Sequence, residues 1–219
     1  MADREPLTAE EDQDVKRVLV IGASGFGAEV AWVIGRMNAV SPTFEIVGFC
    51  DDAPGKQEGQ FCGLPLLGRV ESAAEKADGF VCAVGSNGAR KVLTERALEA
   101  GLMPVTVVDP SAVIAPGTVL GRGCYVGIGS VVSVGVRLGE GALVNHGVTV
   151  GHGAEIGDYA QLCPGVRVSG GCVLGEGVLM GSNACVIPCV RVGAWATVGA
   201  GAAVLRDVDE KGLFVRLCR

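Results

Sequence analysis

A six-residue repeat in the second half of the chain limits its possible folds more than any other feature. Counting every sixth residue from Ile114 to Val204 gives sixteen positions, and all of them are aliphatic. The positions four residues further on, from Thr118 to Val208, are all small. Glycine often follows the aliphatic residue, where a tight corner needs permissive backbone angles. A random stretch rich in Gly and Val could not hold this phase for almost a hundred residues.

This repeat predicts a solenoid of short parallel strands, which is a parallel β-helix. Three hexads form one triangular coil, so residues 18 positions apart stack on one another. Each coil then buries its aliphatic column against its neighbours. The spacing does not determine the handedness, and it predicts an uninterrupted register up to Val208.

The first half of the chain alternates between strand-like and helix-like patterns. Strands are expected at 18–21, 45–50 and 79–84, and helical spacing of apolar residues follows the first and third of them. The second of these helices is expected to contain Val92, Leu93 and Leu98. Such alternation is typical of a small parallel α/β sheet of the Rossmann-like kind. We therefore expect a disordered tail (1–16), a Rossmann-like α/β domain (17–108) and a β-helix domain (109–219).

Composition excludes several classes of function. The net charge is −6 without a block of Lys or Arg, so a nucleic-acid surface is not expected. The nine cysteines form no CxxC pair, which is typical of reduced thiols in a cytoplasmic protein, and no metal site is expected. The acidic N-terminal segment lacks the features of a signal peptide. The sequence contains no stretch of 18 apolar residues, so no membrane span is expected.

A glycine-rich motif and an acidic pair mark a candidate ligand site in the first half. The motif Gly22-x-x-Gly25-x-Gly27 lies between a strand and a helix, where backbone N–H groups can approach a phosphate. It is about equally compatible with a tight structural turn. Asp51 and Asp52 end the next strand, where carboxylates can reach ribose or base donors. An NAD-dependent reaction is disfavoured because no domain would present a hydride acceptor.

The only two histidines, His146 and His152, lie in successive hexads at expected corners of the β-helix. Histidine is the side chain best suited to accepting a proton from a substrate near neutral pH. Spacing alone selects neither residue. Gly170 follows His152 by 18 residues, one coil away, and has no side chain, while its N–H could stabilise an oxyanion.

The whole chain from about residue 17 resembles the hexapeptide-repeat sugar acyltransferases of the sialic-acid O-acetyltransferase type, which include UDP-4-amino-sugar and GDP-perosamine N-acetyltransferases. The stretches that carry the resemblance are 21–27, 48–52, 145–152 (NHGVTVGH), 164–171 (PGVRVSGG), 198–204 and 209–212. The resemblance implies a left-handed β-helix and a homotrimer with active sites between neighbouring helices. It implies acetyl transfer from acetyl-CoA to the amino group of a nucleotide-linked 4-amino-6-deoxy sugar in surface glycan biosynthesis, without a metal.

The resemblance also assigns roles to individual residues. His152 corresponds to the catalytic base and Gly170 to the oxyanion donor, whereas His146 is expected to have a packing role. The residues implied for the nucleotide sugar are Ser24, Gly25, Phe26, Asp51, Asp52 and Gly85, and those implied for coenzyme A are Gln161, Ser182 and Ala200. Ser86, Asn87 and Arg90 are further candidates for substrate binding, and the alternative for them is a helix cap and a solvated arginine.

Three departures from the family pattern stand out. Gly153 replaces the acidic residue that usually follows the catalytic histidine, so Glu155 or Asp158 of this or a neighbouring subunit is a candidate substitute. Gln161 replaces a second histidine, and residues 215–219 replace the usual Gly-Val-Pro-Ala ending. Alternatives are O-acetylation of a sugar such as sialic acid and a non-catalytic β-helix scaffold. A metal-dependent hydratase would need three histidine ligands.

Overall fold

The computed structural model describes residues 17–56 and 58–215. The contacts within the chain divide it into two compact units, residues 1–107 and 108–219. The tail predicted to be disordered, residues 1–16, lies outside the described residues.

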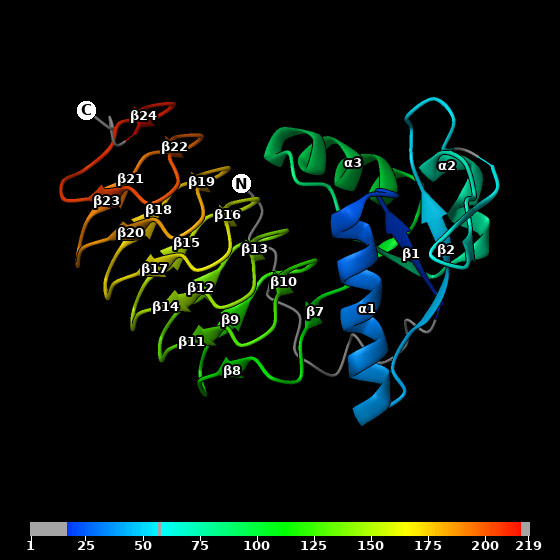
Figure 1. Ribbon diagram of the computed structural model, residues 1–219, viewed down its shortest axis with the longest axis horizontal. Helices are drawn as coiled ribbons and strands as arrows, with labels where there is room; N and C mark the ends of the chain where they lie inside the picture. Colours follow the sequence, from blue (N-terminus) through cyan, green and yellow to red (C-terminus); the bar gives the residue numbers. More distant parts are fainter. Residues whose placement is uncertain (1–16, 57, 216–219) are drawn as a thin grey trace. The chain divides into compact units, whose positions relative to one another are not determined.

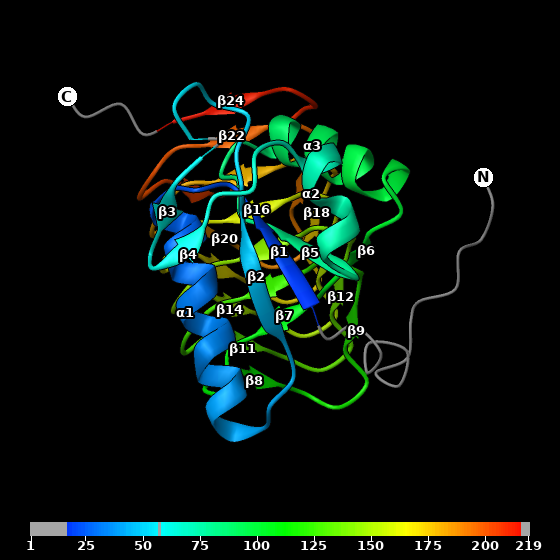
Figure 2. The same ribbon diagram turned by 90° about the vertical axis from the view of Figure 1, so that its right-hand side faces the viewer.

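The first unit is built on a parallel four-stranded sheet with the order β2-β1-β5-β6. The strands are β1 (Arg17–Ile21), β2 (Glu45–Cys50), β5 (Gly79–Cys82) and β6 (Met103–Pro104). Helix α1 (Gly25–Val40) connects β1 to β2, and helix α3 (Asn87–Glu99) connects β5 to β6. Figure 2 shows α1 on one face of the sheet and α3 on the other. Because both faces are covered, all the central strand residues Val18–Ile21 are buried.

The order of the strands creates a crevice in this sheet. From the central strand β1 the chain moves outward to β2, whereas from β5 it moves outward in the opposite direction to β6. Ligands of open α/β sheets bind at such a reversal, beyond the carboxyl ends of the strands. A small hairpin of β3 (Gln60–Phe61) and β4 (Leu64–Pro65), helix α2 (Val70–Ala73) and a 3₁₀ turn (Ala74–Lys76) complete the unit.

Helix α3 lies where the sequence predicts it, but two of the three apolar residues that mark it in the sequence are exposed. Arg90, Thr94 and Ala97 are buried, whereas Val92 and Leu98 are exposed. The apolar residues Val92 and Leu98 therefore do not mark the inner face of this helix.

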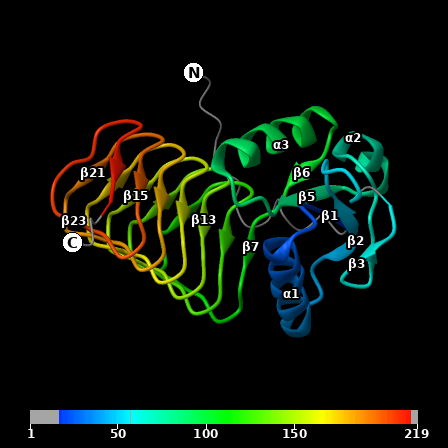
Figure 3. The ribbon, with the colours of Figure 1, turned by 45° about the horizontal axis from the view of Figure 1, so that its top comes forward.

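The second unit is a β-helix made of three parallel sheets (Figures 1 and 3). The first sheet contains β7 (Val107–Val108), β10 (Tyr125–Val126), β13 (Leu143–Val144), β16 (Gln161–Leu162), β19 (Leu179–Met180), β22 (Thr197–Val198) and β24 (Leu213–Phe214). The second contains β8 (Val113–Ile114), β11 (Val131–Val132), β14 (Thr149–Val150), β17 (Arg167–Val168), β20 (Cys185–Val186) and β23 (Ala203–Val204). The third contains β9 (Val119–Leu120), β12 (Arg137–Leu138), β15 (Glu155–Ile156), β18 (Val173–Leu174) and β21 (Arg191–Val192).

The chain visits the three sheets in turn, which creates three rows of corners. We call the turn from the first to the second sheet the first corner, the turn from the second to the third sheet the second corner, and the turn from the third to the first sheet the third corner. Strands pair in register with partners 18 residues away, as Val131 does with Thr149 and Val132 with Val150. The predicted stacking of equivalent residues is therefore confirmed.

Both columns of the repeat form the core of the β-helix. The aliphatic residues from Val126 to Val204 and the small residues from Cys124 to Ala202 are all buried. Ile114, Leu120 and Val208, near the ends of the repeat, are partly buried and pack against this core. The register changes after Val204, contrary to the prediction. Val208 pairs with Val192 and Leu213 with Thr197, so the last coil is two residues shorter and Val208 occupies the aliphatic column.

The α/β domain followed by a β-helix is thus the predicted fold. No helix in the part of the chain that the structure describes is long and apolar enough to cross a membrane.

Candidate functional site

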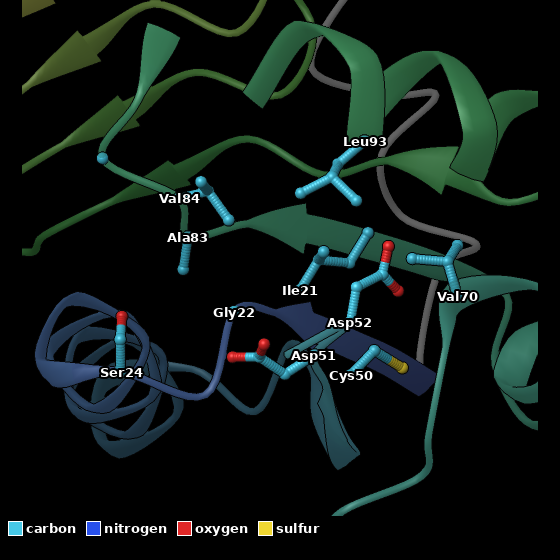
Figure 4. A pocket seen from close by; sticks show the side chains of 11 residues that line it. Ile21, Gly22, Ser24, Cys50, Asp51, Asp52, Val70, Ala83, Val84 and Leu93 are labelled. Carbon is cyan, nitrogen blue, oxygen red and sulfur yellow. The ribbon is translucent and has the colours of Figure 1, made fainter. Parts of the chain in front are cut away.

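The α/β unit contains a pocket of about 240 Å³ at the reversal of strand order. Its wall combines apolar side chains with two carboxylates and glycine-bearing loops (Figure 4). The lining residues are Ile21, Gly22, Ser24, Cys50, Asp51, Asp52, Val70, Ala83, Val84, Gly85 and Leu93. They follow the carboxyl ends of β1, β2 and β5, as expected for a ligand site in this kind of sheet.

The three glycines of the loop after β1 have different reasons for being glycine. Gly22 has a φ of +111°, and a Cβ there would lie 2.7 Å from the carbonyl oxygen of Ala83. A Cβ on Gly27 would clash with the carbonyl oxygen of Gly22. Both therefore serve backbone packing, whereas a Cβ on Gly25 would meet nothing within 4 Å. Only Gly25 lacks a packing reason, and it is the first residue of α1.

Ser24 stands at the N-cap of α1, but its side chain does not cap the helix. Figure 4 shows Ser24 at the start of α1, and Ser24 lines the pocket. Within the described residues the hydroxyl has no hydrogen-bond partner, so it is available to a ligand. The positive end of the α1 dipole favours an anion at this position.

Asp51 ties two loops of the pocket together. Its Oδ2 accepts a hydrogen bond from the Ala23 N–H at 2.9 Å, and its Oδ1 accepts one from the Ala53 N–H at 2.9 Å. The Lys56 ammonium lies 3.5 Å from Oδ2 and donates to the Ala23 carbonyl oxygen at 2.8 Å. Asp51 thus has a structural role, and its remaining lone pairs can still accept from a ligand.

Asp52 belongs to an ion-pair network at the other side of the pocket. Arg96 on α3 donates from Nη1 to Asp52 Oδ2, and it also forms two hydrogen bonds with Glu71 at 2.7 and 2.9 Å. Hydrogen bonds to Glu71 from its own backbone N–H and then from Arg96 lower the pKa of this carboxyl. The guanidinium therefore fixes the direction of the Asp52 side chain, which points toward Leu93 and Val70 in Figure 4.

The loop after β5 carries Gly85, and buried Arg90 anchors it. The Arg90 side chain is 1% exposed and donates from Nη1 to the Val84 carbonyl oxygen at 3.0 Å and to Asn87 Oδ1 at 3.3 Å. The interpretation of Arg90 as a solvated residue is therefore wrong. Ser86 accepts a hydrogen bond from the Ala89 N–H, which confirms the alternative that it caps the helix.

Cys50 contributes a neutral thiol to the pocket wall. Burial, and to a lesser extent the Asp52 carboxylate, raises the pKa of Cys50 to about 12. A protonated thiol is a poor nucleophile, so Cys50 is not suited to covalent catalysis.

The structure brings together four of the six residues implied for the nucleotide sugar. Ser24, Asp51, Asp52 and Gly85 line the pocket. Gly25 is adjacent to it, and half-buried Phe26 is not among its lining residues.

Sequence reasoning did not identify Lys56, Arg96 or Glu71. Asp52 and Arg96 are 44 residues apart, so no local spacing links them. The one available signal is that Arg96 lies three residues after Leu93, a pocket residue on the same face of α3.

In the β-helix, His152 lies at the second corner between β14 and β15, with Gly170 in the next coil. The Gly171 N–H donates to the His152 carbonyl oxygen at 2.9 Å, which fixes the stacking of the two corners. The His152 side chain is exposed and makes no hydrogen bond within the described part of the chain. The N–H of Gly170 likewise has no partner among the described residues, so a proton acceptor and a free N–H donor lie side by side.

The residues implied for coenzyme A lie elsewhere on the β-helix. Ser182 and Ala200 occupy the first corner, in the same row as His146. Gln161 is half-buried on β16 of the first sheet, with its Nε2 3.6 Å from the Cys163 sulfur. His146 is exposed, and its N–H donates a hydrogen bond to Asn145 Oδ1 at 2.8 Å. One chain therefore does not place His152 and the Ser182 row at one corner.

Neither candidate acidic partner approaches His152 within the chain. Asp158 lies at the third corner, where its Oδ1 accepts a hydrogen bond from the Glu140 N–H at 2.8 Å. Glu155 is exposed on the third sheet, in register with Arg137. The expectation that either of them orients His152 within its own subunit is wrong. Among residues 17–56 and 58–215, no group of three or more His, Cys, Asp or Glu side chains could hold a metal ion.

Two family models match the chain, one in each of its two units. The PglD N-terminal domain family matches residues 17–97. The bacterial transferase hexapeptide family, described as six repeats, matches residues 135–170. No curated protein matches the sequence in a direct search.

Solved structures similar to the chain cover nearly all of it. The acetyltransferase domain of PglB from Neisseria gonorrhoeae, in complex with acetyl coenzyme A, is 27% identical with a TM-score of 0.82 and covers 92% of this chain and 96% of its own. A histidine mutant of perosamine N-acetyltransferase from Caulobacter crescentus, in complex with CoA and GDP-perosamine, is 30% identical with a TM-score of 0.82 and covers 91% and 93%. WeeI from Acinetobacter baumannii, 24% identical over 90% of this chain and 95% of its own with a TM-score of 0.81, shares the fold. With these matches, the chain belongs to the hexapeptide-repeat sugar acyltransferase family and is an acetyltransferase.

Proposed function

We propose that this protein transfers an acetyl group from acetyl-CoA to the amino group of a nucleotide-linked 4-amino-6-deoxy sugar. The observation that carries the proposal is the exposed His152 beside the free N–H of Gly170, in a chain whose α/β unit offers a pocket at the reversal of strand order. Similar structures contain acetyl coenzyme A, or CoA with GDP-perosamine, which supports both the acyl donor and the class of acceptor.

The pocket supplies groups suited to a nucleotide. Its apolar wall, which includes Val70, Val84 and Leu93, can cover a base, and the Asp52 carboxylate can accept from base or ribose donors. The Ser24 hydroxyl, the N-terminus of α1 and the nearby Lys56 ammonium favour the diphosphate. Gly25 leaves room for it to approach the backbone.

The chemical step needs one base and one oxyanion donor. The neutral amine of the sugar attacks the thioester carbonyl carbon, and His152 takes the amine proton as the C–N bond forms. The Gly170 N–H stabilises the negative oxygen of the tetrahedral intermediate. When the C–S bond breaks, the imidazolium returns the proton to the thiolate of coenzyme A. The products are the acetylated sugar nucleotide and free coenzyme A.

A homotrimer would complete this site. His152 lies at the second corner and the Ser182 and Ala200 row at the first corner, so one sheet separates them within a chain. Packing the second corner of one copy against the first corner of another would bring the base to the coenzyme A row. Exposed apolar side chains at the second corner, namely Val134, Ile187 and Leu205, are suited to burial in such an interface.

A panel of acceptors tests the proposal. Coenzyme A release is measured with UDP-, GDP- and dTDP-linked 4-amino-6-deoxy sugars, with the corresponding 4-hydroxy sugars and with free sialic acid. Turnover with at least one amino-sugar nucleotide, and loss of it when the amine is absent, is the expected result. Turnover with sialic acid alone would establish the O-acetylation alternative, and no turnover with any amino-sugar nucleotide would contradict the proposed class of acceptor.

A further inference from the structure

The Gly170 residue has a steric relation to His152 that its proposed role as an oxyanion donor does not require. A Cβ placed on Gly170 would lie 2.6 Å from Cε1 and 2.6 Å from Nε2 of the His152 imidazole, and 3.1 Å from its Nδ1. Real Cβ atoms do not approach other heavy atoms this closely. The imidazole therefore occupies the space that any other residue at position 170 would need for its side chain.

The backbone gives no other reason for glycine at this position. Gly170 is not among the residues with a positive φ, so its conformation suits any L-amino acid. The equivalent position of each hexad from Pro110 to Ala200 occurs sixteen times, and Gly170 is the only glycine among them. The others include Val134 in the coil before His152 and Pro188 in the coil after Gly170. A side chain is thus the rule at this corner position, and the exception faces the imidazole.

Orientation of the imidazole is otherwise unexplained in this chain. A functional histidine is usually held by a hydrogen bond from its second ring nitrogen to a carboxylate or carbonyl group. In the part of the chain described here, His152 makes no such bond, and Gly153 cannot supply a carboxylate.

We infer that the Cα of Gly170, which carries no side chain, forms a packing surface that positions the His152 imidazole, in place of the acidic neighbour that the chain lacks. We call this packing surface the seat. This inference rests on the proposed function, because it assigns Gly170 a second task in the same acyl transfer. Packing of the ring on the Gly170 backbone limits its rotation, and it keeps the imidazole beside the N–H of the same residue. Base and oxyanion donor are thereby held at a fixed distance from each other by a single stacked pair.

The substitution Gly170→Ala separates this role from a purely structural one. The atoms that an added Cβ would meet belong to the end of a side chain, so the ring can swing away while the backbone stays in place. By contrast, a Cβ on Gly175 would lie 2.6 Å from the backbone nitrogen of Ala194 and would disturb the coil itself. Gly170→Ala is therefore expected to fold normally, with a melting temperature within about 2 °C of the parent.

Nuclear magnetic resonance of the free protein tests the seat without relying on activity. The chain has two histidines, so histidine-selective ¹³C labelling gives two imidazole signals, and His152→Asn identifies the one from His152. A nuclear Overhauser effect between His152 Hε1 and the Hα protons of Gly170 is expected. In Gly170→Ala the His152 signal is expected to move while the His146 signal stays. An unchanged His152 signal in Gly170→Ala would overturn the inference.

Kinetics then show whether the seat matters for catalysis. With an accepted amino sugar, Gly170→Ala is expected to lower kcat about 10- to 100-fold while KM changes less than about threefold, because the base is misplaced but the nucleotide pocket is intact. In the His152→Asn background, Gly170→Ala should have no further effect. Ala194→Ser adds one atom at the equivalent position of the third corner and should change neither signal nor rate. A shifted His152 signal with unchanged kcat would show that Gly170 positions the imidazole but that this positioning does not matter for catalysis. Unchanged turnover in His152→Asn would refute the proposed function itself.

Discussion

The α/β unit and the β-helix hold their candidate site residues by different physical means. Around the pocket, polar side chains are fixed by bonds between distant parts of the chain, as Asp51 is by the Ala23 and Ala53 N–H groups and Asp52 is by Arg96. At the second corner of the β-helix, His152 has no such partner among the described residues and is placed by coil stacking on Gly170. A binding site for a polar ligand thus uses a hydrogen-bond network, whereas the candidate base relies on shape.

On this account, the first unit binds the nucleotide sugar and the second corner of the β-helix carries out the chemical step. Changes in the first unit are expected to alter affinity for the nucleotide sugar, and changes at the second corner are expected to alter the rate of the chemical step. The following substitutions test that separation, in decreasing order of the expected change.

Removal of the candidate base has the largest expected effect. His152→Asn keeps a polar side chain of similar size but cannot accept the amine proton, so kcat should fall about 10²- to 10⁴-fold. The paired variant His146→Asn, at the first corner, should retain most of the activity. Steady-state coenzyme A release measures both. Equal losses in the two variants would contradict the assignment of the base.

Removal of the buried guanidinium tests the network of the α/β unit. Arg90→Met fills much of the same space but loses the hydrogen bonds to the Val84 carbonyl oxygen and Asn87. Hydrogen bonds from a charged group contribute about 2 kcal/mol, so affinity for the nucleotide sugar should fall about 30-fold as the Gly85 loop loosens. Titration calorimetry measures the affinity, and kcat at saturation should change little. A variant that binds normally but turns over slowly would contradict the separation.

An acidic residue directly after His152 should increase the rate of the chemical step. A Cβ on Gly153 would meet nothing within 4 Å, and its φ of +64° is one that Asp and Asn tolerate better than most residues. Gly153→Asp should raise kcat about two- to tenfold, because a nearby carboxylate stabilises the imidazolium that forms. Gly153→Asn has the same shape without the charge and serves as the control. Equal rates in the two variants would show that charge beside His152 is not limiting.

The smallest expected effect concerns the pH dependence of stability. Because the pKa of Glu71 is lower in the folded chain than when unfolded, its contribution is present above the unfolded value and is lost as pH falls through the folded value. Glu71 is half exposed, so Glu71→Gln should lower the free energy of unfolding by less than about 1 kcal/mol at pH 7. Urea unfolding between pH 7 and about pH 2 should show the two proteins converging. A constant difference, or an equal effect of Glu75→Gln, would contradict this role.

The sequence was most informative where one local rule repeats. Sixteen hexads made the β-helix and the stacking of Gly170 on His152 predictable, because coil geometry turns a spacing of 18 into a contact. The sequence does not predict that the last coil is two residues shorter, because Val208 suits both the aliphatic and the small column of the core. In the α/β unit the pocket could be placed from strand ends, but the Arg96 network and the burial of Arg90 could not. Those contacts join residues far apart in sequence, and no periodicity encodes them.

The affinity for the nucleotide sugar, measured without turnover, tests most directly whether the first unit binds the substrate and the β-helix supplies the base. The accepted nucleotide-linked amino sugar is titrated, in the absence of acetyl-CoA, into the parent chain, His152→Asn and Asp51→Asn. We predict a Kd for His152→Asn within about twofold of the parent. For Asp51→Asn we predict a Kd about tenfold weaker, because an amide cannot accept from both the Ala23 and Ala53 N–H groups. Loss of binding in His152→Asn together with unchanged binding in Asp51→Asn would contradict the division.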